Sequence, residues 1–319
     1  MHREELRFRA GDASLAATLT LPEARGRRPW ALLVPSWLPR NRDGAWDRER
    51  HPDWFAPPTR DEGGGFLARL GDALAERGVA SLRYDPRGCG ESDGSWEGSA
   101  YFTRIDDARD AIGAMRSRPE LDLRRTAIVG HGEGAGIALS VAIGDPAIGA
   151  VGLIGASARS LRTVLRRGVA ERGRTRTDRQ HPAVAALDRA SEELLERAER
   201  REASLDVAIG DATVTLGLAS WEQAIHTPPL ALATMLHRET VLLHGADDAW
   251  ADPEESELLA AVLAEAGNQP ALTIPPGAHD LAEAGDEVIG EFASALVARM
   301  QPRELPPVLL AIERMGGSG

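Results

Sequence analysis

The sequence predicts an α/β fold in which a mostly parallel sheet carries helices on both faces and a helical segment is inserted late in the sheet. The first observation is alternation, because apolar runs typical of strands buried on both faces recur between stretches with helical spacing. The second is an interruption, since no apolar run suited to a central strand occurs from residue 157 to about residue 236. The third is that several strands end in glycine-rich or charged turns.

The expected elements follow one another along the chain. Residues 4–9 and 14–21 alternate polar and apolar side chains, which predicts an antiparallel pair of strands. The remaining strands are expected at 31–34, 79–84, 126–129, 150–154, 240–243 and 271–274, and helices near 63–77, 103–117, 135–143, 253–266 and 285–300. An α/β core (1–156 and 237–303) would then hold a helical lid at 157–236, with a C-terminal tail at 304–319.

Composition and charge argue against several classes of function. The chain of 319 residues has a formal net charge of −12, which disfavours nucleic acid or an anionic membrane as the main partner because like charges repel. Cys89 is the single cysteine, so no internal disulfide can form. The N-terminus lacks an apolar signal segment, and no stretch approaches the roughly 18 apolar residues of a membrane span. We therefore expect a soluble cytoplasmic protein without cofactor or metal ion, compatible with a homodimer.

A glycine-rich turn follows the strand at 126–129. Residues 130–134 read GHGEG and lead into a helix of small residues, which is the layout of a nucleophile elbow. Such a turn is so sharp that its flanking residues must be small, and it lifts the central residue, here Gly132, above the sheet. The alternative is a generic strand-to-helix turn, even one that binds phosphate.

An acid and a histidine follow two later strands. Asp248 comes after the strand at 240–243, and His279 comes after the strand at 271–274. The order of elbow, acid and histidine is that of a hydrolytic triad, in which Asp248 would orient the imidazole and His279 would act as general base and then general acid. The alternative is that Asp248 caps a helix and His279 lies in a loop without catalytic function.

With these motifs, the sequence resembles the serine α/β-hydrolases, in particular bacterial esterase-like members with a helical lid. The elbow of that group commonly reads GHSEG, and its third-strand loop resembles GSGPxDRDG, which Pro39 and residues 42–44 match. Residues 85–92, DPRGCGES, resemble its DxRGxGxS segment. The resemblance covers about residues 5–300 and implies an α/β-hydrolase fold. It also implies an oxyanion hole formed by the backbone N–H groups of Trp37 and Glu133.

Two departures from this pattern bear on activity. Residues 36–38, SWL, replace small residues in the oxyanion loop, and Gly132 replaces the nucleophilic serine. Glycine has no side chain to attack a carbonyl carbon, so no acyl-enzyme can form at residue 132. Structural roles are expected for Cys89 and Ser140. Ser36 ranks first among possible replacements, but the sequence assigns none.

Three interpretations therefore stay open. The chain is an ester or thioester hydrolase that has lost its serine and is inactive or strongly impaired. Alternatively, it is a natural enzyme in which the His279–Asp248 pair activates water or abstracts a substrate proton without covalent catalysis. In the third, it is a pseudoenzyme that binds a ligand and catalyses nothing.

The expected ligand is a small apolar acyl or aryl ester. Six of the seven tryptophans, among them Trp221 and Trp250, fall on loops or the lid at the carboxyl ends of the strands, where α/β sheets bind ligands. His131 and His226 are further candidates for substrate binding. The alternatives are that the tryptophans anchor loops and that His226 lies on the surface. Arginines at 166–167 and 172–179 are expected to form a solvated lid face rather than an anion site.

Overall fold

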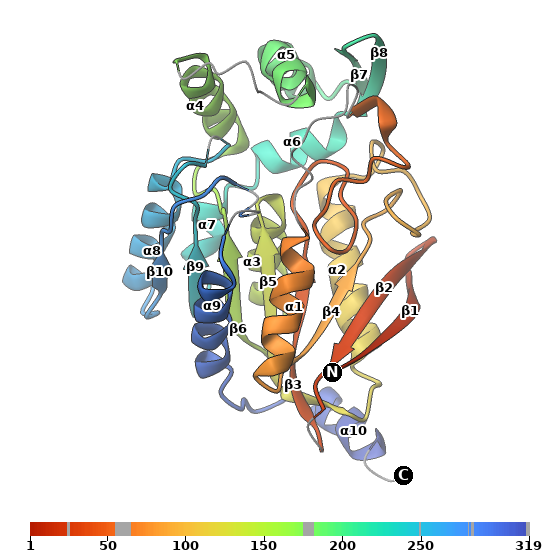
Figure 1. The fold of residues 1–319 in the computed structure, drawn as a ribbon, viewed down its shortest axis with the longest axis vertical. Helices are drawn as coiled ribbons and strands as arrows, with labels where there is room; N and C mark the ends of the chain where they lie inside the picture. The colour runs from red at the N-terminus through yellow and green to blue at the C-terminus, as the bar shows by residue number, and fades with distance from the viewer. Residues whose placement is uncertain are drawn as a thin grey trace.

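A computed structural model describes residues 1–23, 26–54, 65–174, 182–248, 250–279, 281 and 284–316. Its centre is an eight-stranded sheet with the strand order β1-β2-β4-β3-β5-β6-β9-β10 (Figure 1). These strands are β1 (His2–Ala10), β2 (Ala13–Leu21), β3 (Arg28–Val34), β4 (Ala80–Tyr84), β5 (Leu121–His131), β6 (Ile148–Ile154), β9 (Glu239–Leu243) and β10 (Ala271–Thr273). Six neighbouring strands, from β4 to β10, run parallel, whereas β2 pairs antiparallel with both β1 and β4.

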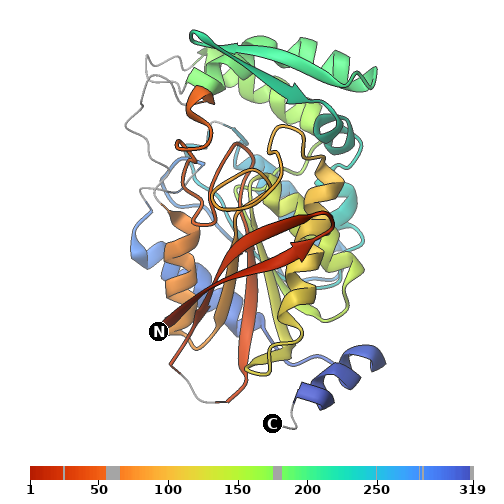
Figure 2. The same cartoon turned by 90° about the vertical axis from the view of Figure 1, so that its right-hand side faces the viewer.

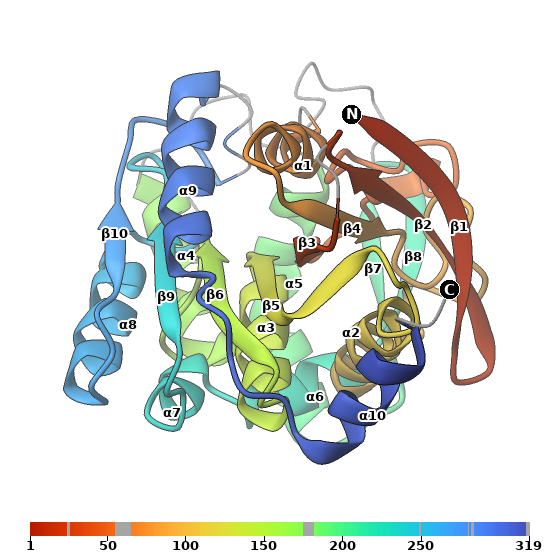
Figure 3. The ribbon, with the colours of Figure 1, turned by 90° about the horizontal axis from the view of Figure 1, so that it is seen from below.

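Helices cover both faces of the sheet, as the alternation of the sequence predicts (Figure 3). Helices α1 (Phe66–Glu76) and α9 (Asp286–Arg299) pack on one face. Helices α2 (Tyr101–Met115), α3 (Glu133–Gly144) and α8 (Glu254–Glu265) pack on the other. Every residue of β4 and β6 is buried, because both faces of these strands are covered. The expected fold, a mostly parallel α/β sheet of the α/β-hydrolase type, is confirmed.

Most of the segment between β6 and β9 lies over the carboxyl ends of the parallel strands (Figure 1), whereas its last helix packs against α3 and α8. It contains α4 (Leu161–Arg174), α5 (Pro182–Glu199), β7 (Ser204–Ile209), β8 (Ala212–Gly217), α6 (Ala219–Ile225) and α7 (Pro229–Ala233). Besides the expected helices, this segment contains an antiparallel hairpin, which β7 and β8 form at its outer end (Figure 2).

The hairpin has a signal in the sequence. Leu205, Val207 and Ile209 alternate with exposed residues, and Gly210 takes a φ of 61° in the turn. Its buried side chains pack with the lid helices and not with the central sheet. The hairpin strands therefore contain no long apolar run, which is the pattern that identifies the strands of the central sheet.

The C-terminal tail contains a helix. Residues 307–316 form α10 (Pro307–Gly316), and Leu305 and Leu309 are buried against Leu123 and Ala147. Residues 317–319 lie outside the described part of the chain. Of the helices described, none is long and apolar enough to span a membrane.

Candidate active site

The turn between β5 and α3 has the backbone of a nucleophile elbow. Gly132 has φ 56° and ψ −118°, and its N–H donates to the Ile154 carbonyl at 2.8 Å. A Cβ atom on Gly130 would lie 1.9 Å from the Gly134 carbonyl oxygen, and one on Gly134 would lie 2.6 Å from the Val34 carbonyl oxygen. Glycine is therefore required at the flanking positions because the chain passes too close for any side chain.

His279 and Asp248 form a hydrogen-bonded pair beside this turn. Their Nδ1 and Oδ2 atoms are 2.7 Å apart, and the Asp248 side chain is fully buried. Asp248 also accepts the N–H groups of Trp250 and Ala251, and His244 lies 3.2 Å away. Burial alone would raise the pKa of Asp248, but His279 and His244 hold that pKa below the usual range of a carboxyl group. The pair therefore has the geometry of a charged acid that orients a histidine base.

His131 lies behind His279 and not in the pocket. The two rings stack with their centroids 4.8 Å apart, and Nε2 of His131 is 2.9 Å from the His279 carbonyl oxygen. His131 is buried and is absent from the described residues that line the pocket. The expectation that His131 binds substrate is therefore corrected, because its geometry is that of a residue that positions His279.

The Ser36 hydroxyl fills the space above the elbow. Ser36 Oγ is 3.3 Å from Nε2 of His279. A Cβ atom built on Gly132 would lie 2.1 Å from Ser36 Oγ and 2.9 Å from the same Nε2 atom. The hydroxyl thus occupies the place in which a side chain of residue 132 would stand. The sequence favours Ser36 among possible replacements but does not assign it, because the spacing of residues 36, 132 and 279 does not show their contact.

The loop that carries Ser36 and Trp37 is held firmly. Leu38 has a φ of 73° although it is not glycine, which costs about 1–3 kcal/mol and persists where surrounding packing enforces it. Four residues on, the Arg42 guanidinium bonds Asp85 at 2.7 Å, and its backbone N–H donates to the same carboxylate at 2.6 Å. The buried Asp85 carboxylate thereby fixes this loop to the loop that follows β4.

Two backbone N–H groups, those of Trp37 and Glu133, are the expected donors of an oxyanion hole. Glu133 is the first residue of α3, where an N–H has no acceptor within the helix. Within the described part of the chain, neither the Glu133 N–H nor the Trp37 N–H has a hydrogen-bond acceptor. Both residues line the pocket. Unpaired N–H groups beside a reacting centre can stabilise a developing oxyanion.

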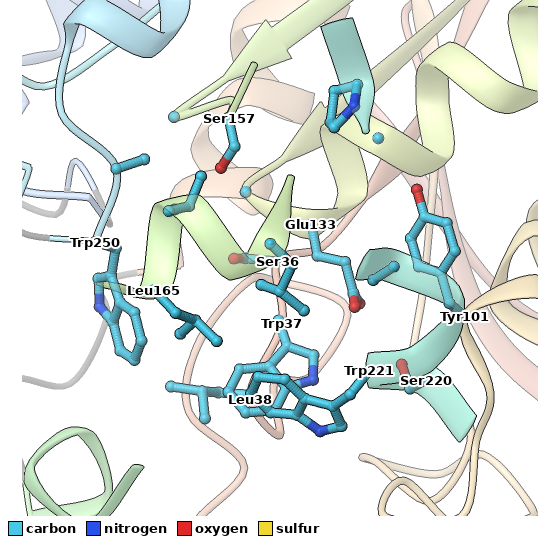
Figure 4. Close-up of a pocket in the computed structure, with 18 of the residues that line it drawn as sticks. Ser36, Trp37, Leu38, Tyr101, Glu133, Ser157, Leu165, Ser220, Trp221 and Trp250 are labelled. Atoms are coloured by element: carbon cyan, nitrogen blue, oxygen red, sulfur yellow. The ribbon is translucent and has the colours of Figure 1, made fainter. Parts of the chain in front are cut away.

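A pocket of about 140 Å³ opens beside Ser36, Gly132 and His279, roughly ten times the 10–15 Å³ that one water needs. Its walls include Trp37, Trp221 and Trp250, as expected for the last two (Figure 4). Trp37 packs edge-on against Trp221, with ring centroids 4.7 Å apart. These aromatic walls suit an apolar ligand.

His226 lies outside the pocket, whereas Glu133 lines it. His226 follows α6 with a side chain that is 63% exposed, and it is not among the described residues that line the pocket. The expectation that His226 binds substrate is therefore corrected. Glu133 lines the pocket and pairs with Arg104 at 2.7 Å, which compensates its charge.

The alternative nucleophiles are turned away from the site. Cys89 is fully buried, and burial raises the pKa of its thiol, which keeps the sulfur protonated and unreactive. Ser140 donates to the Gly136 carbonyl within α3. Arg166 and Arg167 pair with Glu192 and Glu254, which agrees with a solvated lid face. The side chains at 172–179 lie outside the described residues.

One cluster has the composition of a metal site. The possible ligand atoms of Asp47, His51 and Cys89 lie within 4.8 Å of one another. However, the His51 ring nitrogens approach the Gly88 carbonyl at 2.8 Å and the Glu97 carboxylate at 3.1 Å. Both contacts require a nitrogen that donates a proton, so the ring presents no lone pair to a metal. The cluster is better explained as a hydrogen-bond network under the tryptophans.

The fold and the pairing of His279 with Asp248 beside an elbow define an α/β-hydrolase of the serine-hydrolase type. Residues 60–284, more than half of the chain, match the family described as "Serine aminopeptidase, S33" (Hydrolase_4), and the chain belongs to that family. No curated protein matches the sequence.

Solved structures agree on the fold. The esterase Est1E from Butyrivibrio proteoclasticus has a TM-score of 0.60 at 14% identity, covering 92% of this chain and 99% of its own. It is also known with ferulic acid bound. The α/β-hydrolase GrgF from Penicillium sp. sh18 has a TM-score of 0.63 at 16% identity, covering 94% and 99%. An esterase of Pyrococcus furiosus has a TM-score of 0.62 at 14% identity, covering 94% and 92%.

Proposed function

We propose that the protein hydrolyses small apolar carboxylic esters or thioesters, with His279 as general base and Asp248 as the group that orients it. The observation that carries this proposal is the 2.7 Å bond between His279 Nδ1 and Asp248, with Nε2 of the same ring directed at a hydroxyl at the edge of the pocket. A histidine held in one tautomer by a buried carboxylate can take a proton at its other nitrogen.

The substrate class follows from the walls of the pocket. Trp37, Trp221, Trp250 and several aliphatic side chains line it, and among its charged groups the Glu133 carboxylate pairs with Arg104 and the Arg159 guanidinium with Glu254. An apolar acyl or aryl group would bury its surface against the aromatic and aliphatic side chains of this lining. The structural neighbour Est1E, which holds ferulic acid in one structure, is consistent with an aryl ligand.

Gly132 limits how the reaction can proceed. No acyl-enzyme can form on residue 132, and the loss of a catalytic serine costs on the order of 10⁶-fold in turnover in serine hydrolases. The elbow still contributes its backbone, because the Glu133 N–H has no acceptor within α3 and its residue lines the pocket, where such a donor can stabilise a developing oxyanion. Hydrolysis therefore depends on another hydroxyl group or on water, activated by His279.

The test compares p-nitrophenyl esters from acetate to decanoate with the wild-type protein, His279→Ala and His226→Ala. His226 is a matched control because it is a histidine of the same chain that lies exposed and outside the pocket. We expect cleavage by the wild type and by His226→Ala, and a loss on the order of 10³-fold in His279→Ala. Equal rates in all three proteins, or rates equal to buffer alone, would exclude the proposal.

A further inference from the structure

We propose that Ser36 is the nucleophile of this site, so that the acyl group is carried on the loop after β3 and not on the elbow. This inference rests on the proposed function and adds the residue that forms the covalent intermediate. The residue lies two positions beyond the end of β3, at the carboxyl edge of the sheet, and lines the pocket.

The Ser36 hydroxyl occupies the space of an elbow side chain. A side chain on Gly132 would begin 2.1 Å from Ser36 Oγ, a separation at which two atoms cannot both be present. The same Cβ position lies 2.9 Å from His279 Nε2. A hydroxyl delivered from residue 36 therefore reaches the place that an elbow serine would supply, and only glycine at residue 132 leaves room for it in this rotamer.

The Ser36 hydroxyl is hydrogen-bonded to the proposed general base. In the described part of the chain, His279 Nε2 is the sole hydrogen-bond partner of Ser36 Oγ, at 3.3 Å. Asp248 holds the proton of the ring on Nδ1, so Nε2 is the nitrogen that accepts. The chain of Asp248, His279 and Ser36 thus has the connectivity that activates a serine, and such bonds are often long before substrate binds.

The expected oxyanion donors also fit a nucleophile at residue 36. In an elbow, one donor is the N–H of the residue that follows the nucleophile. With Ser36 as nucleophile, that residue is Trp37, whose N–H has no acceptor among the described residues. The Glu133 N–H then serves as the second donor. The two donors expected from the sequence are retained, although the nucleophile belongs to the other segment.

The reaction balances with groups that are present. Ser36 Oγ forms a bond to the carbonyl carbon, and its proton moves to His279 Nε2. The bond from carbon to the leaving oxygen or sulfur breaks, and the leaving group takes that proton. Water then attacks the acyl-serine, passes a proton to Nε2, and the bond from carbon to Oγ breaks as Ser36 recovers a proton. The net change is one ester and one water converted to an acid and an alcohol, or to an acid and a thiol for a thioester.

The experiment combines a p-nitrophenyl alkylphosphonate with ester assays. Attack by an activated hydroxyl forms a stable bond to phosphorus and releases p-nitrophenolate. Trypsin places Ser36 in the peptide of residues 28–40, RPWALLVPSWLPR, which has no other hydroxyl, thiol or imidazole group. The elbow falls in a separate peptide, residues 126–159. The mass of the labelled peptide therefore identifies the nucleophile directly.

We expect the phosphonate on peptide 28–40 of the wild type and of Ser140→Ala, and no such label in Ser36→Ala or His279→Ala. Ser36→Ala should also lose ester cleavage on the order of 10³-fold or more, whereas Ser140→Ala should keep it. A label on any other peptide overturns the inference. So does undiminished ester cleavage by Ser36→Ala, which would leave the proposed function standing with water as the nucleophile. Neither label nor ester cleavage in the wild type would overturn both.

Discussion

Substitution of Gly132 by alanine adds one methyl group at the most restricted point of the site. The backbone there has φ 56° and ψ −118°, a region that costs a residue with a side chain about 1–3 kcal/mol. The new Cβ would lie 2.1 Å from Ser36 Oγ, so the hydroxyl must rotate away and give up its bond to His279, worth about 0.5–1.5 kcal/mol. The free energy of unfolding should therefore fall by about 1.5–4.5 kcal/mol in Gly132→Ala.

Urea unfolding followed by tryptophan fluorescence measures this difference. Gly113→Ala is the matched control, because Gly113 lies within α2 and a Cβ there meets nothing within 4 Å. That control should stabilise the protein by about 0.5–1 kcal/mol through helix propensity. Gly132→Ala should also lose ester cleavage, since its methyl group displaces the hydroxyl. If Gly132→Ala unfolds like the wild type and cleaves esters equally well, the turn is not strained and Ser36 does not occupy the place described.

Three further predictions concern the acid, the aromatic wall and a buried histidine. Asp248→Asn should keep the far-UV circular dichroism of the wild type but lower kcat on the order of 10⁴-fold, and a loss below tenfold would remove Asp248 from the mechanism. Trp221→Ala, which deletes a buried ring packed on Trp37, should lower the free energy of unfolding by about 3–5 kcal/mol and raise KM for aryl esters; unchanged values would contradict its place in the wall. Burial lowers the pKa of His51, but Glu97 and the Gly88 carbonyl raise that pKa above its unfolded value. The stability that His51 contributes should thus be complete below about pH 6.5 and decline as pH rises through the pKa of His51 in the folded protein. Urea titrations at several pH values measure this dependence, and His51→Gln should abolish it.

The sequence predicts the sheet well because a strand that is buried on both faces is a continuous run of apolar residues. Runs such as residues 31–34 and 150–154 are apolar throughout, and they became β3 and β6. The β7–β8 hairpin was missed because each strand buries one face only, so its signal is alternation over six residues. The helix at 307–316 was missed because its small apolar face covers only the edge of the core.

The sequence predicts those site residues that come directly after the end of a strand. It does not predict residues whose role depends on a contact between distant parts of the chain. The positions of Gly132, Asp248 and His279 follow from chain order and turn chemistry. The contact of Ser36 with His279 joins residues 243 positions apart and depends on a strained loop at Leu38. The sequence does not distinguish His131 from His226, since the burial of one beside His279 and the exposure of the other after α6 are properties of packing.

The central claim is that the base, the oxyanion donors and the pocket of a serine hydrolase are all in place around a glycine elbow. The most direct measurement is p-nitrophenyl ester cleavage by the double variant Gly132→Ser/Ser36→Ala beside Ser36→Ala alone. Removal of the Ser36 hydroxyl eliminates the 2.1 Å conflict, and a small shift of the His279 ring relieves the remaining approach of 2.9 Å between the new Cβ and Nε2. We predict that the double variant cleaves esters several orders of magnitude faster than Ser36→Ala. A folded double variant that is no faster than Ser36→Ala on any ester would contradict the claim.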